Sequence, residues 1–388
     1  MLHCDTNFYY TITVAKAALL SLAKIKKIID QICCESVVLR LVPMSPAAAA
    51  VKPIQPETSR NQPENSLALA VKRRLLRISP LEVTTEHRRF IVDCPDKQQR
   101  IEAVGTAFLQ GYHAAIESSH CDQLHDALGT VPFEYQGFAY EGAAMGVGLL
   151  DQLQPWRDPK FASFLSSEQN AYPYLTHVGM GWALARFPGG MHRFCQSLTA
   201  AEAITTEASS LHSPLVCLVL DGYGFHQSFF DWERYVVAMH EPRFLPPDCL
   251  PIFRQGVGRS LCFVFGMDGD RVAKAIAPFP PSSQADLWSG VGLAMAYAGG
   301  LSTADVGHLL QHAGGDAAAL AQGVAFAAKA RQRAGFIPEH TQQVCQTVWG
   351  ESVDTVARLT DATLAQLPLS SMTAAYALWR ERIQQAFS

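Results

Sequence analysis

The sequence has little charge and no concentrated block of it. Charged residues make up only 17% of the 388 residues, against about 25% in a typical soluble domain. The 31 Lys and Arg residues are outnumbered by 35 Asp and Glu residues, so no basic stretch would neutralise a run of phosphates, and we expect no nucleic-acid partner. Because 48% of the residues are apolar, the low charge indicates a large buried or ligand-facing surface rather than disorder.

Cysteine pairs with the spacing of a metal or redox motif are also missing. The ten cysteines are scattered and form no C-x-x-C pair, which argues against a zinc ribbon and against a disulfide framework. We also expect no secretory leader, and therefore reduced thiols in a cytoplasmic protein.

The N-terminus lacks an uninterrupted apolar run. Residues 11–32 contain four lysines, so we do not expect them to span a bilayer, which needs about 20 mostly apolar residues. Apolar residues fall on one face of a helical wheel and lysines on the other, which predicts a basic amphipathic helix in an N-terminal extension over 1–42. Such a helix would contact a membrane surface peripherally or dock on a partner. The alternative is a poorly anchored extension before the folded domain.

A proline-rich segment separates this extension from the rest of the chain. Residues 43–66 contain five prolines, which prevent regular structure and predict a linker. We expect one folded domain over 67–388. Its apolar residues mostly recur with a helical period, in segments 101–116, 138–153, 174–187, 229–239, 288–298, 318–334 and 342–359. Three short segments are more typical of strands, at 89–92, 215–220 and 261–265. The predicted fold is mainly α with a few short strands.

Three short sequences recur in one order at a spacing of about 150 residues. Y-E-G-A-A-M-G at 140–146 corresponds to W-S-G-V-G-L-A at 288–294, and two further pairs flank it, 104–108 with 257–261 and 179–183 with 323–327. This order predicts a tandem duplication of helical halves, about 96–240 and 248–388, packed about a pseudo-twofold axis with a cleft between them. The alternative is chance, because Gly and Ala are common in these segments.

Signatures of cofactor and metal sites are absent. The glycines at 222 and 224 follow an apolar run, but the third glycine and the acidic residue of a dinucleotide fold are missing. The histidines near 120–125 and 305–312 lack a further ligand at a characteristic spacing. We therefore assign neither a cofactor nor a metal.

Three residues are the candidates for catalysis. Glu141 is the only charged residue between 138 and 150. A carboxyl in apolar surroundings has a raised pKa and serves as a general acid, although a residue in the first helical turn would instead interact with backbone N–H groups. Asp221 and His226 lie with Tyr223 in a predicted Gly-rich turn, which would present a carboxylate and an imidazole to the pocket of Glu141. The alternative is that the Asp221 side chain only forms a hydrogen bond to the backbone of its own turn.

Several polar and aromatic residues inside apolar segments are candidates for substrate binding. For the charged ones the alternative role is an internal ion pair, since buried charges need partners. These candidates are Tyr140, His177, Trp182, Tyr223, Arg259, Asp286 and Trp288.

The same segments resemble the UnbL-type family, a bacterial family of unassigned function found beside the iterative polyketide synthases that make enediynes. The matching blocks are F-A-Y-E-G-A-A-M (138–145), H-V-G-M-G-W-A-L-A-R (177–186), L-D-G-Y-G-F-H (220–226), Q-G-V-G-R-S-L (255–261), D-L-W-S-G-V-G-L-A (286–294), Y-A-G-G (297–300) and A-Q-G-V-A-F-A-A-K-A-R (321–331). The long N-terminal extension departs from the pattern of the family.

The resemblance implies an accessory protein of natural-product biosynthesis. With the low charge and the aromatic-rich helices, it leads us to expect a long unsaturated apolar substrate, such as a polyene or an isoprenoid chain, that is isomerised or cyclised by cofactor-free acid/base chemistry. The alternative is a non-catalytic scaffold or binding partner of a polyketide synthase, or a homodimer.

Overall fold

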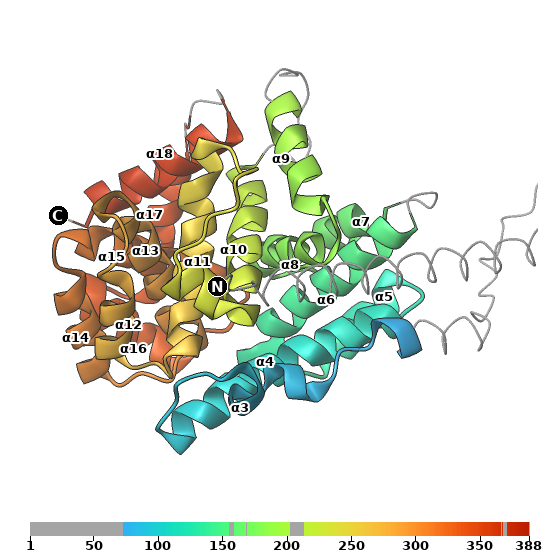
Figure 1. Ribbon diagram of the computed structural model, residues 1–388, viewed down its shortest axis with the longest axis horizontal. Helices are drawn as coiled ribbons and strands as arrows, with labels where there is room; N and C mark the ends of the chain where they lie inside the picture. The colour runs from blue at the N-terminus through green and yellow to red at the C-terminus, as the bar shows by residue number, and fades with distance from the viewer. Residues whose placement is uncertain are drawn as a thin grey trace, which may run out of the picture. The chain divides into compact units, whose positions relative to one another are not determined.

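Apolar and small residues form helices through nearly all of the chain that the computed structural model describes, residues 73–154, 159–167, 169–201, 213–365, 367 and 371–387 (Figure 1). The chain divides into two units, Met1–Gln62 and Pro63–Ser388, and every described residue belongs to the second. The predicted extension over 1–42 and the linker over 43–66 therefore lie outside the described residues. The α-helices are α3 (Thr85–Arg88), α4 (Pro95–Glu117), α5 (Cys121–Gly129), α6 (Phe133–Leu153), α7 (Lys160–Ser166), α8 (Pro173–Arg186), α9 (Gly190–Ala201), α10 (Leu218–Phe230), α11 (Leu250–Val264), α12 (Gly269–Ile276), α13 (Pro281–Ala298), α14 (Thr303–Ala313), α15 (Ala317–Arg333), α16 (Glu339–Trp349), α17 (Val353–Leu364) and α18 (Met372–Gln385).

Short helical turns join several of these helices. The 3₁₀ turns are η1 (Pro80–Val83), η3 (Pro214–Cys217), η5 (Pro247–Cys249) and η6 (Gly314–Asp316), and η4 (Glu233–Val237) is a π-turn. The predicted helix over 229–239 is wrong in its bounds, because α10 ends at Phe230 before η4 begins. The predicted helix over 342–359 is interrupted at Gly350, whose φ of 69° ends α16.

The predicted strands are wrong, because no strand occurs among the described residues. Residues 215–220 lie in η3 and α10, and residues 261–265 lie at the end of α11. Both helices are buried on nearly all sides, so no polar face marks their helical period and a short apolar run looks like a strand. Arg89 in the third segment follows α3 in the left-handed conformation.

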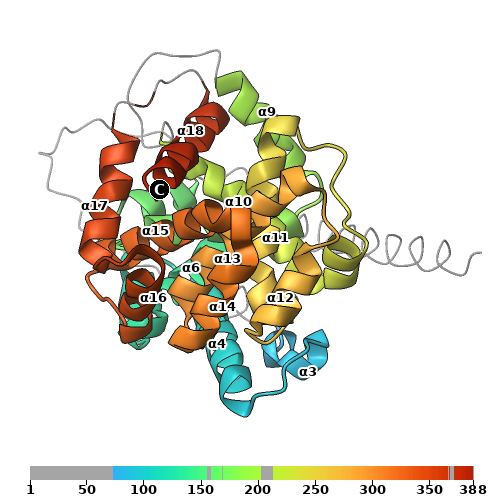
Figure 2. The ribbon, with the colours of Figure 1, turned by 90° about the vertical axis from the view of Figure 1, so that its left-hand side faces the viewer.

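The buried helices form a row in which each one packs against the next, in the order α4, α6, α8, α10, α11, α13 and α15. Shorter or more exposed helices connect successive members of this row, and Figure 2 shows α14, α16, α17 and α18 around α13 and α15. The two ends of the row also meet, since Arg100 Nε of α4 donates to Ala298 O of α13 at 2.7 Å and Arg331 Nη1 of α15 donates to Glu134 O of α6 at 2.9 Å. The row thus encloses buried side chains from α4, α6, α8, α10 and α11.

Glycines let the helices of this row approach backbone to backbone. A Cβ on Gly256 of α11 would lie 1.9 Å from the carbonyl oxygen of Asp221 in α10, and a Cβ on Gly290 of α13 would lie 2.0 Å from that of Gln255 in α11. Gly222, Gly292 and Gly323 make the same kind of contact. Close helix packing therefore offsets the cost of glycine inside a helix.

This glycine contact bears on the predicted duplication. The three sequence pairs align α4 with α11, α6 with α13 and α8 with α15, in keeping with two halves. However, the glycines of α10 and α11 make the same contacts although they belong to neighbouring helices. A glycine pattern that repeats in every buried helix accounts for the sequence pairs as well as a duplication of two halves does. The duplication with its pseudo-twofold axis therefore stays a prediction.

The glycine packing predicts the effect of two alanine substitutions. Gly256→Ala should make the protein about 2–3 kcal/mol less stable, because the added Cβ overlaps a backbone oxygen that cannot move alone. Gly307→Ala in α14 is the control: no atom lies within 4 Å of its Cβ position, so it should stabilise by up to about 1 kcal/mol through helix propensity. Denaturant unfolding of both variants measures the difference, and equal stability would contradict backbone-to-backbone packing.

Candidate functional site

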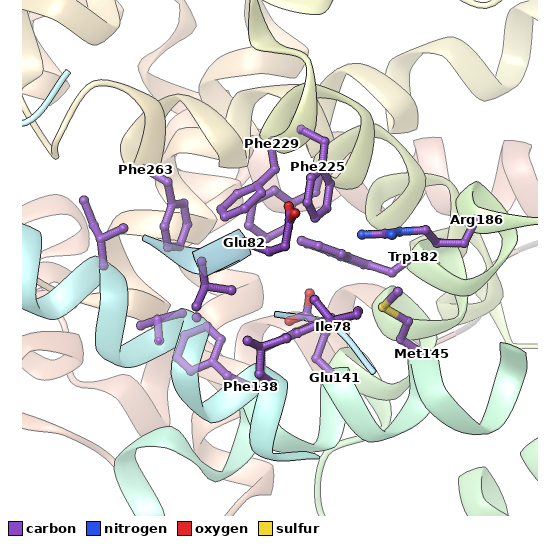
Figure 3. Close-up of a pocket in the computed structure, with 17 residues that line it drawn as sticks. Ile78, Glu82, Phe138, Glu141, Met145, Trp182, Arg186, Phe225, Phe229 and Phe263 are labelled. Carbon is purple, nitrogen blue, oxygen red and sulfur yellow. The ribbon is translucent and has the colours of Figure 1, made fainter. Parts of the chain in front are cut away.

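One cavity among the described residues has six phenylalanines among the 17 residues that line it. It lies between α4, α6, α8, α10 and α11, and residues 78–83 with η1 form part of its wall (Figure 3). Its empty volume, counting space open to solvent, is about 550 Å³, but the freely accessible part has room for only about three water molecules. The phenylalanines are Phe108, Phe138, Phe225, Phe229, Phe230 and Phe263.

Glu141 supplies a carboxyl to this apolar wall. It lies in the middle of α6, with 1% of its surface exposed, and Figure 3 shows it pointing toward Trp182 and the phenylalanines of α10. The alternative role in the first turn of a helix is wrong, because α6 begins at Phe133 and Glu134 occupies that turn. Neither carboxyl oxygen of Glu141 has a hydrogen-bond partner.

These surroundings hold Glu141 near the midpoint of its titration at neutral pH. Burial raises its pKa and the charge of Asp221 raises it further, while Arg259 lowers it, with a net pKa of about 7. The indole N–H of Trp182 also favours the carboxylate, although its geometry falls outside that of a hydrogen bond, since Trp182 Nε1 has no partner. A carboxyl with this pKa can both give and take a proton near pH 7.

Arg259 of α11 joins Glu141 to a second buried carboxylate. Its Nη1 donates to Asp221 Oδ1 at 2.5 Å, and its Nη2 lies 3.9 Å from Glu141 Oε2. Its guanidinium also lies 4.7 Å from the ring centroid of Phe225. Burial alone would lower the pKa of Arg259, but the charges of Asp221 and Glu141 outweigh burial and raise it. The internal ion pair is therefore the role that the structure gives Asp221 and Arg259.

Gln255 extends this polar cluster across the core. Its Nε2 donates to Asp221 Oδ2 at 2.8 Å and to Tyr376 Oη at 3.0 Å, and its Oε1 accepts from Ser289 Oγ at 3.2 Å. Both oxygens of Asp221 are thus engaged, in contrast to those of Glu141. Asp221 has little capacity left to act on a ligand.

His226 lies beside the cavity and is held neutral. Arg186 Nε donates to His226 Nε2 at 3.1 Å, and burial together with the Arg186 charge lowers the pKa of His226 to about 3. The predicted Gly-rich turn is wrong, because Asp221, Tyr223 and His226 all lie inside α10. None of the three is among the residues that line the cavity.

The other candidates for substrate binding separate into two groups. Trp182 lines the larger cavity and Arg259 lines a smaller one. The remaining five line neither cavity and are buried elsewhere. Tyr140 Oη bonds to His125 Nδ1, His177 Nδ1 bonds to Pro173 O, Tyr223 Oη accepts from Gln227 Nε2, Asp286 Oδ1 accepts from Arg380 Nη2, and Trp288 packs in the core.

The sequence analysis did not single out Glu82 and Phe230, which line the cavity, or Arg88 beside them. Glu82 of η1 forms an ion pair with Arg88 Nη2 at 2.8 Å, and the guanidinium groups of Arg88 and Arg186 lie 4.9 and 4.8 Å from the ring centroid of Phe230. The closely spaced phenylalanines at 225, 229 and 230 were the available signal, since positions four apart share a helix face.

The histidine clusters have other partners. Asp305 forms a capping box with Ser302, and His312 Nε2 bonds to Asp270 Oδ1 at 2.8 Å. Within the described ranges, no three His, Cys, Asp or Glu side chains are grouped in a way that would hold a metal ion. In the same ranges, none of the helices combines the length and the apolar character needed to cross a bilayer.

Comparison with known proteins places the chain in a family. Neither the curated proteins nor the solved structures include a significant match to it. One family model matches residues 67–387, and its description is "Protein of unknown function (DUF1702)". Since the match covers most of the chain, including the whole phenylalanine-lined cavity, the protein belongs to this family.

Proposed function

We propose that the protein binds a long unsaturated apolar molecule, such as a polyene or an isoprenoid chain, in the phenylalanine-lined cavity, and that Glu141 acts as an acid and base on its double bonds. One observation carries this proposal: a buried carboxyl with a pKa of about 7 and no hydrogen-bond partner lines a cavity that is apolar apart from Glu82 and Arg186. An unpaired buried carboxyl costs stability, so its retention there calls for a role.

Glu141 alone can supply the proton that the reaction needs and take one back. The protonated carboxyl would give its proton to one carbon of a double bond, which leaves a carbocation on the substrate. Trp182 and the phenylalanine rings would stabilise that cation through their π faces. The Glu141 carboxylate, with Arg259 Nη2 3.9 Å away, would then take a proton from a neighbouring carbon. The outcome is a shifted double bond or, where a second double bond attacks the cation first, a ring.

Binding a long chain requires the lining to move. The accessible space holds only about three water molecules, and residues 78–83 form part of the wall. Few bonds fix the segment that leads into this wall: Tyr112 Oη donates to Leu76 O at 2.8 Å, and Ile78 N donates to His113 Nε2 at 3.3 Å. Displacement of this segment would widen the cavity between α4 and α10.

The resemblance of the seven sequence blocks to the UnbL-type family supports the biosynthetic setting. Members of that family are found beside the iterative polyketide synthases that make enediynes. We therefore propose an accessory role in natural-product biosynthesis, with a cofactor-free isomerisation or cyclisation as the reaction.

A second candidate function is a non-catalytic partner of such a synthase. Phe133 is 62% exposed and stacks on Phe336 with ring centroids 6.0 Å apart, and Ile337 is 38% exposed. Exposed apolar side chains of this kind are typical of a contact surface, and a scaffold would use them in place of the cavity.

Quenching of tryptophan fluorescence separates the two functions. A linear conjugated tetraene hydrocarbon absorbs where tryptophan emits, so the tetraene bound in the cavity should quench Trp182. The quenching reports binding, and its concentration dependence gives the affinity. Trp182→Phe should change this affinity, because Trp182 lines the cavity, whereas Trp232→Phe should not, because Trp232 does not. The two are matched, since Nε1 of each lacks a hydrogen-bond partner. No binding would contradict the proposed function, and an affinity that Trp182→Phe leaves unchanged would place the tetraene outside the cavity.

A further inference from the structure

A second, smaller cavity lies on the other side of the Glu141–Arg259 contact. Its empty volume, counting space open to solvent, is about 320 Å³, the freely accessible part has room for only about one or two water molecules, and it is formed by α8, α10, α11, α13 and α15. Three polar side chains line it, Arg259, Tyr297 and Tyr174. The remaining wall is apolar: Leu175, Val178, Leu218, Leu293, Phe326, Ala327 and Ala330.

Arg259 and Tyr297 each have a buried hydrogen-bond donor without a partner. Arg259 Nε and Tyr297 Oη have no hydrogen-bond partner, and the residues are only 3% and 2% exposed. Native structures rarely leave buried donors unpaired. Two of them on one cavity indicate that an acceptor oxygen belongs there.

The surrounding residues keep the Tyr297 hydroxyl in place. The guanidinium of Arg331 lies 3.9 Å from the centroid of the Tyr297 ring and fixes that ring. The hydroxyl occupies space that only a glycine leaves open, because a Cβ on Gly137 would lie 1.9 Å from Tyr297 Oη. The fold thus accommodates a hydroxyl that bonds to no protein atom.

The two cavities share a wall. Glu141 lines the larger and Arg259 the smaller, with 3.9 Å between Nη2 and Oε2 and no hydrogen bond joining them. Phe138 of the larger cavity meets Tyr297 of the smaller one edge to face, with centroids 5.2 Å apart. A ligand that reaches from one cavity into the other would have to separate the Glu141–Arg259 ion pair and the Phe138–Tyr297 ring contact, neither of which is a hydrogen bond.

We infer that the smaller cavity takes the oxygen-bearing end of the ligand, and that Arg259 Nε and Tyr297 Oη donate to a neutral carbonyl there. This inference rests on the proposed function, because the apolar chain of the same ligand would occupy the larger cavity beside Glu141.

The charges around Arg259 favour a neutral carbonyl over a carboxylate. Asp221 already pairs with Arg259 at 2.5 Å, and Glu141 lies 3.9 Å away. A carboxylate ligand would therefore bring a further buried anion to a guanidinium that is already paired. A ketone, aldehyde, ester or amide oxygen needs only the two donors. The substrate class is thus a polyene or isoprenoid chain with a neutral carbonyl at one end.

Tyr297→Phe tests the inference with little disturbance of the fold, because the hydroxyl it removes has no partner. The probes are the methyl ester of cis-parinaric acid, a fluorescent tetraene with an ester carbonyl, and a hydrocarbon with the same tetraene. Tyr297→Phe should weaken the ester by about two- to tenfold, the worth of one hydrogen bond, and leave the hydrocarbon unchanged. The free acid should bind the wild type less tightly than the ester. Tyr223→Phe is the control, since that hydroxyl lines neither cavity, and it should alter neither affinity.

The outcomes separate this inference from the proposed function. If the hydrocarbon binds and Tyr297→Phe leaves the ester affinity unchanged, the inference is wrong while the apolar cavity stands. If the free acid binds more tightly than its ester, the carbonyl assignment is wrong. If neither tetraene binds the wild type, the proposed function fails as well.

Discussion

Replacing Glu141 by glutamine should slow the reaction by about a hundredfold to ten-thousandfold, the usual worth of a general acid or base. Glutamine keeps the size of the side chain and removes the proton that titrates. Because the Glu141 oxygens bond to no protein atom, the substitution breaks no hydrogen bond, and the melting temperature should change little near pH 4.5, where folded Glu141 is protonated. The measurement is product formation, followed by mass spectrometry, when the purified protein is incubated with the tetraene hydrocarbon.

Glu82→Gln is the matched control for this prediction. Glu82 is the other carboxyl that lines the cavity, but it is partly exposed and paired with Arg88. Its substitution should lower product formation much less than Glu141→Gln. Unchanged product formation by Glu141→Gln would leave Glu141 without a catalytic role and would favour the scaffold function.

Replacing Arg259 by methionine should destabilise the protein by about 3–5 kcal/mol, the cost of removing one partner of a buried ion pair. The substitution leaves the fully buried Asp221 carboxylate without its cationic partner. It also removes the positive charge that lies 3.9 Å from Glu141. Denaturant unfolding near neutral pH measures the loss.

A double variant shows whether the loss comes from the stranded charge. Asp221→Asn combined with Arg259→Met removes both charges and keeps the bond from Gln255 to residue 221 within reach, so it should recover much of the stability. If the double variant is as unstable as the single one, the guanidinium stabilises the protein through its packing on Phe225 and not through its charge.

The helical class and the burial of Glu141 followed from the sequence because both depend on local pattern. Segment 101–116 alternates apolar and polar residues enough to show a helical period, and it lies within α4. Glu141 stands alone among apolar residues, and such a position in a helix without a polar face is buried. These inferences need no knowledge of distant residues.

The strand errors and the missed contacts have a different cause. In α10 and α11 the glycines serve contacts with neighbouring helices, which a single sequence does not show, so the pair at 222 and 224 looked like a turn. Asp221 pairs with a residue 38 positions away, and His226 with one 40 positions away. Such pairings depend on tertiary packing, which a single sequence does not show. Because Asp221 and His226 bind these distant partners, they do not line the cavity.

The pH dependence of stability tests most directly whether Glu141 is a carboxyl of raised pKa. In the unfolded chain it ionises near the ordinary value of 4.5, and in the folded protein near 7. Between these values the folded state holds a proton that the unfolded state has lost, so this carboxyl makes the protein less stable as the pH rises through that window. The contribution of this carboxyl to the free energy of unfolding is fully present below about pH 4.5 and is lost as the pH rises to about 7.

The measurement is the difference in free energy of unfolding between wild type and Glu141→Gln, taken from about pH 4 to pH 8. Relative to the variant, the wild type should lose up to about 3 kcal/mol between about pH 4.5 and pH 7, because one proton held only by the folded state costs about 1.4 kcal/mol per pH unit. It should lose no more at higher pH. A difference that stays constant over this range would show that Glu141 has an ordinary pKa, and would contradict its role as the acid of the cavity.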